Sequence, residues 1–340
     1  MSLKHRVLPD VRRACLRALL QSSRGVRIIE AHNGLSALVA STSYLPSENG
    51  NRLEFDGLWI SSLTSSASKG LPDIELGSLE RRLETIEEIV HVTHKPVIVD
   101  GDTGGEAVNF EYFCSKLEQI GVSAVVIEDK QYPKRNSLCW KASHTLEDPK
   151  VFAAKIQRGR SVLLSNDFMI FARLESLIVN QGVEDALARA RIYLLAGVDG
   201  IMIHSKERTI DQVHAFLNGY KYLCAELGFR KPIICVPTTY NVVTDEDLFR
   251  WGADIVIHAN HLLRAAHHAM QQVCETILKN NRSLEADELC TPVSHLFELV
   301  GFADVVARDQ SPAEILSDVF NADLTTADCT PCQPSVKAAV

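Results

Sequence analysis

The chain has 340 residues, 46% hydrophobic and 23% charged, a composition that excludes a disordered or collagen-like chain. Its 35 basic and 43 acidic residues give a formal net charge of −8, which argues against a nucleic-acid-binding surface. No apolar run approaches the ~20 residues that span a bilayer, and nine scattered cysteines are typical of a reducing compartment. We therefore expect a cytoplasmic protein without a membrane segment.

The first 27 residues are basic and could be a transit peptide. However, Val11, Cys15, Leu16, Leu19 and Leu20 repeat at helical spacing and lead directly into a strand-like run. This spacing favours a packed first helix.

Eight short apolar, β-branched runs recur along the chain, each followed by a helical stretch. They are Arg27–Asn33, Gly57–Ser61, Pro96–Asp102, Ala124–Lys130, Phe168–Glu175, Gly200–Lys206, Pro232–Thr239 and Asp254–Asn260. Continuous apolar runs are typical of strands buried on both faces of a parallel sheet. Eight such units predict an α/β fold, the (β/α)8 TIM barrel. A doubly wound open sheet is the alternative, but no run is followed by a dinucleotide or P-loop motif.

The stretches between the runs carry helical signals. Leu79, Leu83, Ile86 and Val90 share one helical face, and Phe110, Phe113, Leu117 and Ile120 share another. Gly121 and Gly197 stand where helices should end, and Thr209 and Thr244 where helices should begin.

Acidic side chains gather where the third and fourth runs end. Asp100 and Asp102 close the third run and Glu128 the fourth, and adjacent strands lie only ~4.8 Å apart. Asp73, in the loop after the second run, could join them. Oxygen-only ligands favour Mg²⁺ or Mn²⁺ over zinc. The alternative is that lysine and arginine side chains neutralise these acids.

Arg173 and His204 end the fifth and sixth runs, and a donor fork beside an imidazole suits a phosphoryl group. The alternatives are a salt bridge from Arg173 to Glu175 and a core histidine. Two polar loops accompany them. The loop 129–138 is long and basic, as lids on barrels often are, and the Ser-rich loop 61–66 could hold a carboxylate.

Several segments together resemble the isocitrate lyase/phosphoenolpyruvate mutase superfamily, and within it phosphoenolpyruvate mutase. They are Glu30–Ala37, Gly57–Leu63, Asp100–Gly105, Ile127–Lys130, Lys134–Leu138, Ala172–Glu175, His204–Lys206 and Ala259–His261. They occur in family order over roughly residues 25–300 and are specific as a set.

The resemblance implies an isomerase that interconverts phosphoenolpyruvate and 3-phosphonopyruvate with Mg²⁺, the first step of phosphonate biosynthesis. Asp100 would bind the metal, and Asp73, Asp102 and Glu128 would hold its waters. Trp59, Ser61, Ser62 and Leu63 would receive the pyruvyl part, and Arg173 and His204 the phosphoryl group. Lys134, Asn136, Ser137 and Leu138 would lie on a gating loop. Asp73, Lys134, Asn136, Arg173 and His204 are the expected catalytic residues.

The same loop separates close relatives. The lyase branch carries a catalytic cysteine in a Lys-Lys-Cys-Gly-His motif, and here residues 134–138 contain none. Phosphonopyruvate hydrolase, which gives pyruvate and phosphate, tends to have threonine where Asn136 stands. Asn136 therefore favours the mutase. A catalytically dead barrel that only binds carboxylates is a third reading, which the intact acidic and Arg173/His204 sets disfavour.

The resemblance also implies a homodimer or homotetramer with a swapped eighth helix. Because forming the C–P bond is uphill, we expect functional coupling to a phosphonopyruvate decarboxylase or similar enzyme. We expect a barrel with its N-terminal helix over residues 1–300, and over 301–340 a helical segment, with a short helix near 311–318, and a loose tail. Only Cys329 and Cys332 form a C-x-x-C pair, and two thiols in that tail are favoured over a zinc site.

Overall fold

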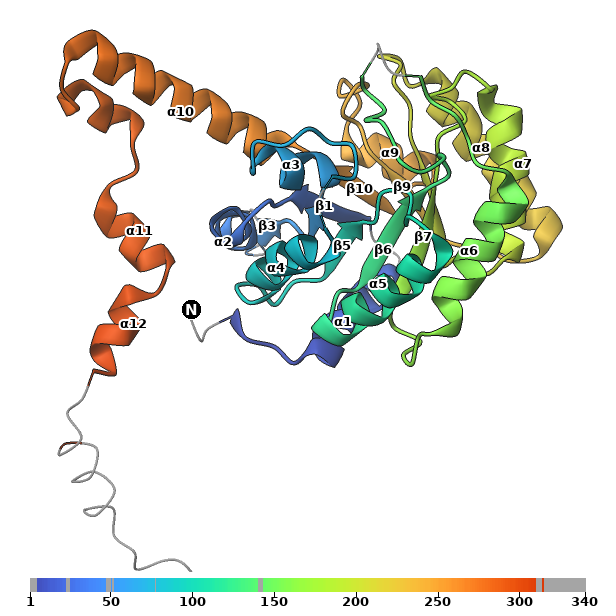
Figure 1. Cartoon of the computed structure of the whole chain (residues 1–340), viewed down its shortest axis with the longest axis horizontal. Helices are drawn as coiled ribbons and strands as arrows, with labels where there is room; N and C mark the ends of the chain where they lie inside the picture. Colours follow the sequence, from blue (N-terminus) through green and yellow to red (C-terminus); the bar gives the residue numbers. More distant parts are fainter. Residues whose placement is uncertain are drawn as a thin grey trace, which may run out of the picture.

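Eight parallel strands close into a barrel in the order β1-β10-β9-β8-β7-β6-β5-β4 (Figure 1). The computed structural model describes residues 5–22, 25–46, 50, 52–76, 78–139, 143–309 and 314. The strands are β1 (Val26–Glu30), β4 (Gly57–Ile60), β5 (Val97–Asp100), β6 (Ala124–Glu128), β7 (Met169–Leu174), β8 (Gly200–Ile203), β9 (Ile233–Cys235) and β10 (Ile255–His258). Seven of them lie within one of the eight apolar runs, and β1 begins one residue before its run, at Val26. The (β/α)8 prediction is confirmed, and the open-sheet alternative is wrong.

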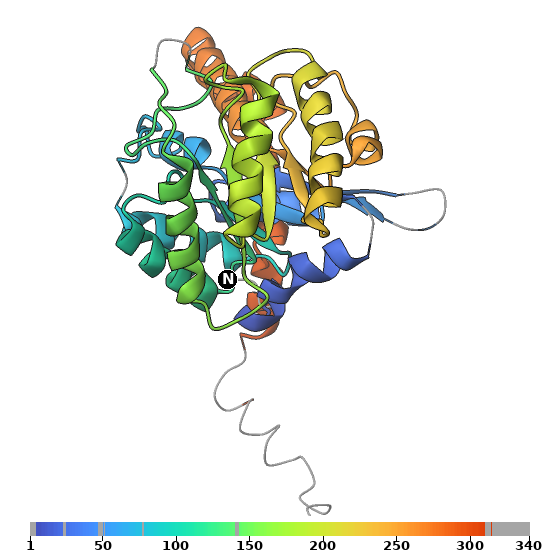
Figure 2. The same ribbon diagram turned by 90° about the vertical axis from the view of Figure 1, so that its right-hand side faces the viewer.

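Helices surround the barrel (Figure 2). They are α2 (Gly34–Thr42), α4 (Leu79–Val90), α5 (Ala107–Ile120), α6 (Pro149–Ser161), α7 (Gly182–Leu195), α8 (Asp211–Leu227) and α9 (Asp245–Trp251). Thr244 caps α9 as predicted, because its hydroxyl accepts a hydrogen bond from the Asp247 amide. The predicted helix start at Thr209 is wrong: α8 begins at Asp211 after Ile210, without a side-chain cap. Gly121 ends α5 at φ 88°, a left-handed conformation that favours glycine.

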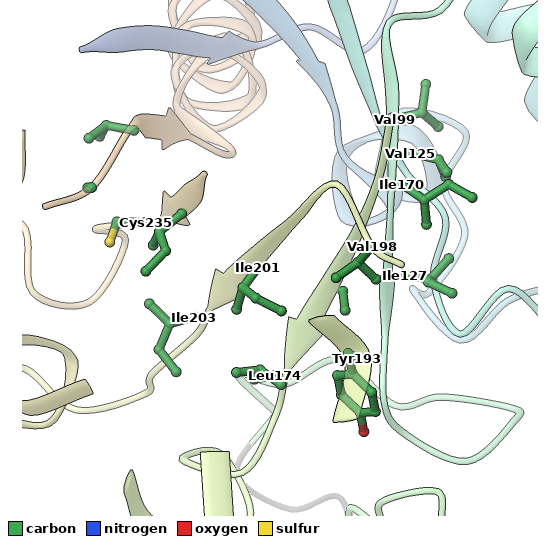
Figure 3. Close-up of a cluster of buried hydrophobic side chains, with 14 of the residues drawn as sticks. Val99, Val125, Ile127, Ile170, Leu174, Tyr193, Val198, Ile201, Ile203 and Cys235 are labelled. Carbon is green, nitrogen blue, oxygen red and sulfur yellow. The ribbon is translucent and has the colours of Figure 1, made fainter. Parts of the chain in front are cut away.

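The core has two layers, because side chains of a strand alternate between its faces. Residues such as Val125, Ile127, Ile170 and Ile201 pack outward against the helices (Figure 3). Residues of the opposite parity, including Ile98, Val126, Phe171, Met202 and Ile257, fill the inside of the barrel. Any residue that continues the inward parity past a strand's carboxyl end therefore faces the mouth of the barrel.

Helix α1 (Pro9–Gln21) closes the amino-terminal end of the barrel. Leu16 is fully buried in the inner core layer, and Leu19 and Leu20 pack against it. The predicted packed first helix is therefore confirmed for these residues. Two small elements follow: the hairpin β2 (Tyr44–Pro46) and β3 (Arg52–Glu54), and α3 (Ser62–Ala67) directly after β4.

Beyond β10 the chain leaves the barrel as a C-terminal arm, residues 261–309 (Figure 1). Its elements are α10 (His261–Asn280), the 3-10 helix η2 (Leu284–Leu289), α11 (Val293–Leu299) and α12 (Phe302–Ala307). None of the 20 residues of α10 is buried, and Val293, Phe297, Phe302 and Val305 are exposed in the last two helices. The arm therefore presents an apolar surface that the described chain does not cover.

One stretch of the arm resembles a membrane span by length and composition alone. It covers residues 284–307, and an 18-residue window within it has a mean hydropathy of 1.4. The stretch consists of three short helices, since Pro292 precedes α11 and Gly301 precedes α12 in a left-handed conformation. The same composition is typical of a surface that packs against another protein chain.

The seven cysteines of the described residues are free thiols. Cys329, Cys332 and the tail lie outside the described residues. So does the helix expected near 311–318, apart from Glu314.

Candidate active site

A narrow cavity of about 50 Å³ opens at the carboxyl ends of the strands. Twelve predicted site residues line it: Trp59, Ser61, Ser62, Leu63, Asp73, Asp100, Lys134, Asn136, Ser137, Leu138, Arg173 and His204. The two others, Asp102 and Glu128, lie behind it and contact the lining residues Lys134 and Arg173. The sequence-predicted residues thus meet at one place.

Strand parity explains this convergence. Asp100 and Glu128 continue the inward parity of Ile98 and Val126, and Arg173 and His204 continue that of Phe171 and Met202. The register of β6 against β7 places Glu128 directly beside Arg173. Carboxylates from β5 and β6 therefore share the mouth of the barrel with the Arg173 guanidinium from β7 and the His204 imidazole after β8.

Asp100 is held by the first residue of α3, the short helix that follows β4. Its Oδ2 accepts hydrogen bonds from the Ser62 hydroxyl at 2.9 Å and amide at 3.3 Å, and its Oδ1 accepts one from the Asp102 amide at 3.1 Å. Among the described residues, Asp100 forms no ion pair. Its carboxylate is therefore fixed in orientation while keeping its charge available.

Asp102 and Asp73, in contrast, are paired with basic groups. Lys134 Nζ lies 2.6 Å from Asp102 Oδ1 and 3.4 Å from Asp73 Oδ1, and Arg82 also contacts Asp102. Burial favours the neutral acid, but the charges of Arg82 and Lys134 outweigh it and lower the pKa of Asp102 to about 2. Basic residues therefore neutralise these two acids, which is the alternative to metal binding that the sequence left open.

Glu128 is buried with both carboxylate oxygens lacking a hydrogen-bond donor. The nearest cations are Lys130 Nζ at 3.1 Å and Arg173 Nη1 at 3.3 Å. Burial dominates and raises the pKa of Glu128 to about 7. A buried carboxylate whose oxygens accept no hydrogen bond is energetically costly. Both oxygens can therefore still accept a hydrogen bond from a further partner, such as a metal-bound water.

The acidic side of the cavity fits a cation with one direct carboxylate ligand. In the part of the chain that the structure describes, no three Asp, Glu, His or Cys side chains converge closely enough to ligate one ion. Asp100, which forms no ion pair among the described residues, can serve as a direct ligand, and Asp73, Asp102 and Glu128 are available to hold the waters of the ion. Mg²⁺ characteristically keeps several of its waters, so this donor set suits it.

Arg173 and His204 form a pair on the opposite side. Arg173 Nη2 lies 2.9 Å from His204 Nδ1, and both groups contact Glu175, at 2.6 Å from Arg173 Nε and 3.0 Å from His204 Nδ1. Burial, aided by the charge of Arg173, lowers the pKa of His204. The salt bridge to Glu175 is therefore present, and it orients the pair at the cavity wall.

The predicted gating loop covers the cavity, and we call residues 129–138 the lid. Lys134 and Ser137 are buried, whereas Leu138 is partly exposed. Asn136 Nδ2 donates to Asp73 Oδ2 at 2.7 Å, and its Oδ1 accepts from the Leu138 amide. The Asn136 amide thus fixes the lid to the loop after β4.

Several further residues belong to the site. Thr238 and Asn260, which stand at the ends of predicted strands where site residues are expected, also line the cavity. Glu75 accepts the Lys134 amide at 2.7 Å and binds Thr103, and Arg82 contacts Asp102 from α4. Glu75 and Arg82 stand at no strand end, so no sequence signal marked them.

Comparison with known proteins places these features in context. A family model described as phosphoenolpyruvate phosphomutase matches residues 16–278. The phosphoenolpyruvate phosphomutase of Tetrahymena pyriformis is 35% identical, over 87% of this chain and 93% of that protein. The crystal structure of phosphoenolpyruvate phosphomutase from Streptomyces platensis subsp. rosaceus has a TM-score of 0.79 and 34% identity, covering 87% of this chain and 98% of that one.

A second enzyme is equally similar. A crystal structure of phosphonopyruvate hydrolase in complex with oxalate and Mg²⁺ has a TM-score of 0.76 and 33% identity, covering 87% of this chain and 97% of that one. Overall similarity therefore does not separate the two activities, and the distinction depends on individual site residues.

Proposed function

Because the chain belongs to the phosphoenolpyruvate phosphomutase family, we propose that it is the isomerase that interconverts phosphoenolpyruvate and 3-phosphonopyruvate. The observation that carries this proposal is the pairing of Arg173 and His204, 2.9 Å apart, opposite a set of buried carboxylates in a cavity covered by a lid. Such a site can hold a phosphoryl group and an enolate in one enclosed space.

The carboxylates support Mg²⁺ as the cofactor. Asp100 would bind the ion directly, and Asp73, Asp102 and Glu128 would hold its waters. When bound, Mg²⁺ would act as a Lewis acid toward the pyruvate enolate. The start of α3, with Ser61, Ser62 and Leu63 on the cavity wall, would receive the pyruvyl carboxylate.

The chain's own groups then account for the transfer. The phosphoryl group must leave an enolate oxygen and reach carbon, through a transition state whose charge is spread over three oxygens. The Arg173 guanidinium and a neutral His204 imidazole can donate hydrogen bonds to those oxygens without attacking phosphorus. Water must stay out, since it would capture the phosphoryl group, and the lid residues Lys134 and Ser137 are buried over the site.

The specific observation for mutase over hydrolase is Asn136. Its amide bonds both Asp73 and the lid backbone, which fixes the lid over the cavity. A threonine there, the residue typical of the hydrolase, lacks an amide that can make both contacts. Phosphonopyruvate hydrolase stays the second candidate, because its overall similarity to this chain is as high.

A ³¹P NMR assay tests the proposal. The full chain is incubated with phosphonopyruvate and Mg²⁺, and the products are resolved by chemical shift. Formation of phosphoenolpyruvate supports the mutase, whereas release of phosphate supports the hydrolase. A sample with EDTA controls for the metal, and turnover that persists in EDTA contradicts the Mg²⁺ proposal.

The remaining proposals concern assembly and context. The exposed apolar C-terminal arm supports a homodimer or homotetramer in which this arm packs on a neighbouring copy. Phosphonopyruvate formation is uphill, so we propose coupling to a decarboxylase or a similar draining enzyme that would commit the product to phosphonate biosynthesis. The division into a barrel and a C-terminal segment near residue 300, and the cytoplasmic location, stay predictions.

A further inference from the structure

Glu175, directly after β7, has a carboxylate that joins the lid to the proposed phosphoryl-binding pair. Its Oε1 accepts a hydrogen bond from Arg173 Nε at 2.6 Å and lies 3.0 Å from His204 Nδ1. Its Oε2 accepts one from the Ser137 hydroxyl at 2.6 Å and lies 3.2 Å from Lys130 Nζ. The residue has no exposed surface. One buried carboxylate thus contacts both the Arg173/His204 side of the site and the lid.

The Ser137 hydroxyl is the point where these contacts meet. It donates to Glu175 and accepts from Arg173 Nη2 at 2.8 Å and from Lys130 Nζ at 2.6 Å. A hydroxyl has one proton to donate and two lone pairs to accept with, so this set of partners uses its full capacity. The Ser137 hydroxyl therefore links the lid to Glu175 and Arg173 at the same time.

The main chain of Glu175 is fixed as well. Its amide donates to Asp129 Oδ1 at 2.9 Å, and Asp129 Oδ2 accepts the Tyr193 hydroxyl at 2.9 Å. Asp129 is fully buried and is the first residue of the lid. The base of the lid and the end of β7 are thus held by a single carboxylate, beneath the contact that Ser137 makes.

Charge supports an ionised Glu175. Burial would raise its pKa, but the charges of Arg173 and Lys130, together with the hydrogen bond from His204, outweigh burial and hold the pKa well below its usual range. A buried anion of this kind is tolerated only while its partners stay in place. Removing its charge should therefore loosen all the groups it contacts.

We infer that Glu175 is a positioning residue that couples closure of the lid, through Ser137, to the orientation of Arg173 and His204. The inference rests on the proposed function of this site and extends it. Because the lid excludes water, the coupling also decides whether carbon or water captures the phosphoryl group. Glu175 acts through these neighbours and does not itself line the cavity.

The test variant is Glu175→Gln, which keeps the size of the side chain and removes its charge. Glu175→Asp restores the charge with a shorter reach. The matched control is Asp185→Asn. Asp185 accepts hydrogen bonds from Ser176 and Arg189 in the outer part of the same network, without touching the lid or the cavity.

Two readouts are needed. The first is ³¹P NMR with phosphonopyruvate and Mg²⁺, where we expect Glu175→Gln to lower kcat about 100-fold, the typical cost of misplaced groups, and to raise the share of phosphate among the products. The second is trypsin cleavage after the exposed lid residue Arg135, with and without Mg²⁺ and oxalate. We expect the ligands to protect wild type and Asp185→Asn, but not Glu175→Gln, with Glu175→Asp in between.

The results separate the alternatives. The inference is overturned if Glu175→Gln keeps ligand-dependent protection of Arg135, or if Asp185→Asn loses as much protection and activity. If Glu175→Gln does not fold, Ser137→Ala takes its place, since it removes the same lid contact from a loop. If wild type forms no phosphoenolpyruvate, the proposed function fails, whereas the trypsin experiment still decides the coupling.

Discussion

Lys134 and Asp102 form a buried ion pair, with Nζ of the lid residue 2.6 Å from Oδ1 of the acid that follows β5. The same ammonium group donates to the Ser62 hydroxyl at 2.7 Å. Closing the lid therefore brings a positive charge to the carboxylates that we propose as the Mg²⁺ site. The lysine and the metal then share one set of acids, and each should weaken the binding of the other.

Substitution of Lys134 tests this competition. We expect Lys134→Met to bind Mg²⁺ roughly tenfold more tightly, because a nearby positive charge has been removed, while turnover falls. Titration calorimetry with MgCl₂ measures the affinity. Arg135→Met is the control, since Arg135 is an exposed cation of the same lid that donates to backbone carbonyls. Equal or weaker Mg²⁺ binding by Lys134→Met would contradict the competition.

Asn136 should govern the fate of the phosphoryl group. Asn136→Ala removes the hydrogen bond to Asp73 and should lower kcat on the order of 100-fold without unfolding the protein, because the side chain is only partly buried in a loop. Asn136→Thr should raise the share of phosphate among the products. Both are measured by ³¹P NMR, with thermal unfolding as the control for the fold. An unchanged kcat in Asn136→Ala would exclude the lid role.

His204 should make stability depend on pH. Burial and the charge of Arg173 lower its pKa below the ordinary 6.5, so the folded protein holds a neutral imidazole. Below pH 6.5 the unfolded chain binds a proton that the folded chain does not, so the free energy of unfolding falls as pH decreases. His204→Asn should lose less stability than wild type between pH 7.5 and 5.5, as measured by urea unfolding. Parallel pH curves for the two proteins would show that His204 does not contribute.

Much of the fold could be predicted because strand periodicity in a barrel is strong. Each of the eight runs coincides with a strand, since a strand buried on both faces must be apolar throughout. Helix starts were predicted less accurately than strands: Thr244 caps α9 as expected, whereas Thr209 does not cap α8. The periodicity did not show that the C-terminal arm leaves the barrel, because an apolar helix that packs on a second chain has the same pattern as one that packs on its own barrel. Only the family resemblance implied a swapped eighth helix.

The sequence could predict which residues form the site, but not which of them contact one another. Asp100, Glu128, Arg173 and His204 all stand at or next to the carboxyl ends of strands, and that position marked them. The partners of each acid depend on distances of a few ångströms, which no spacing in sequence fixes. Thus Asp100 remains without an ion pair among the described residues whereas Asp102 is paired with Lys134 and Arg82.

The amino-terminal helix offers a test of whether the basic start of the chain is structural. Arg12, in α1, is buried, and its guanidinium donates to the carbonyl oxygens of Val90 at 2.7 Å and Thr93 at 3.2 Å. Arg12→Met should lower the free energy of unfolding by about 2–3 kcal/mol, because hydrogen bonds from a charged group are lost and buried carbonyls stay unpaired. The exposed Arg6, changed to methionine, is the control. Urea unfolding of both variants measures the difference. A removable leader would tolerate either change equally, whereas a helix that closes the barrel must be sensitive at Arg12 alone.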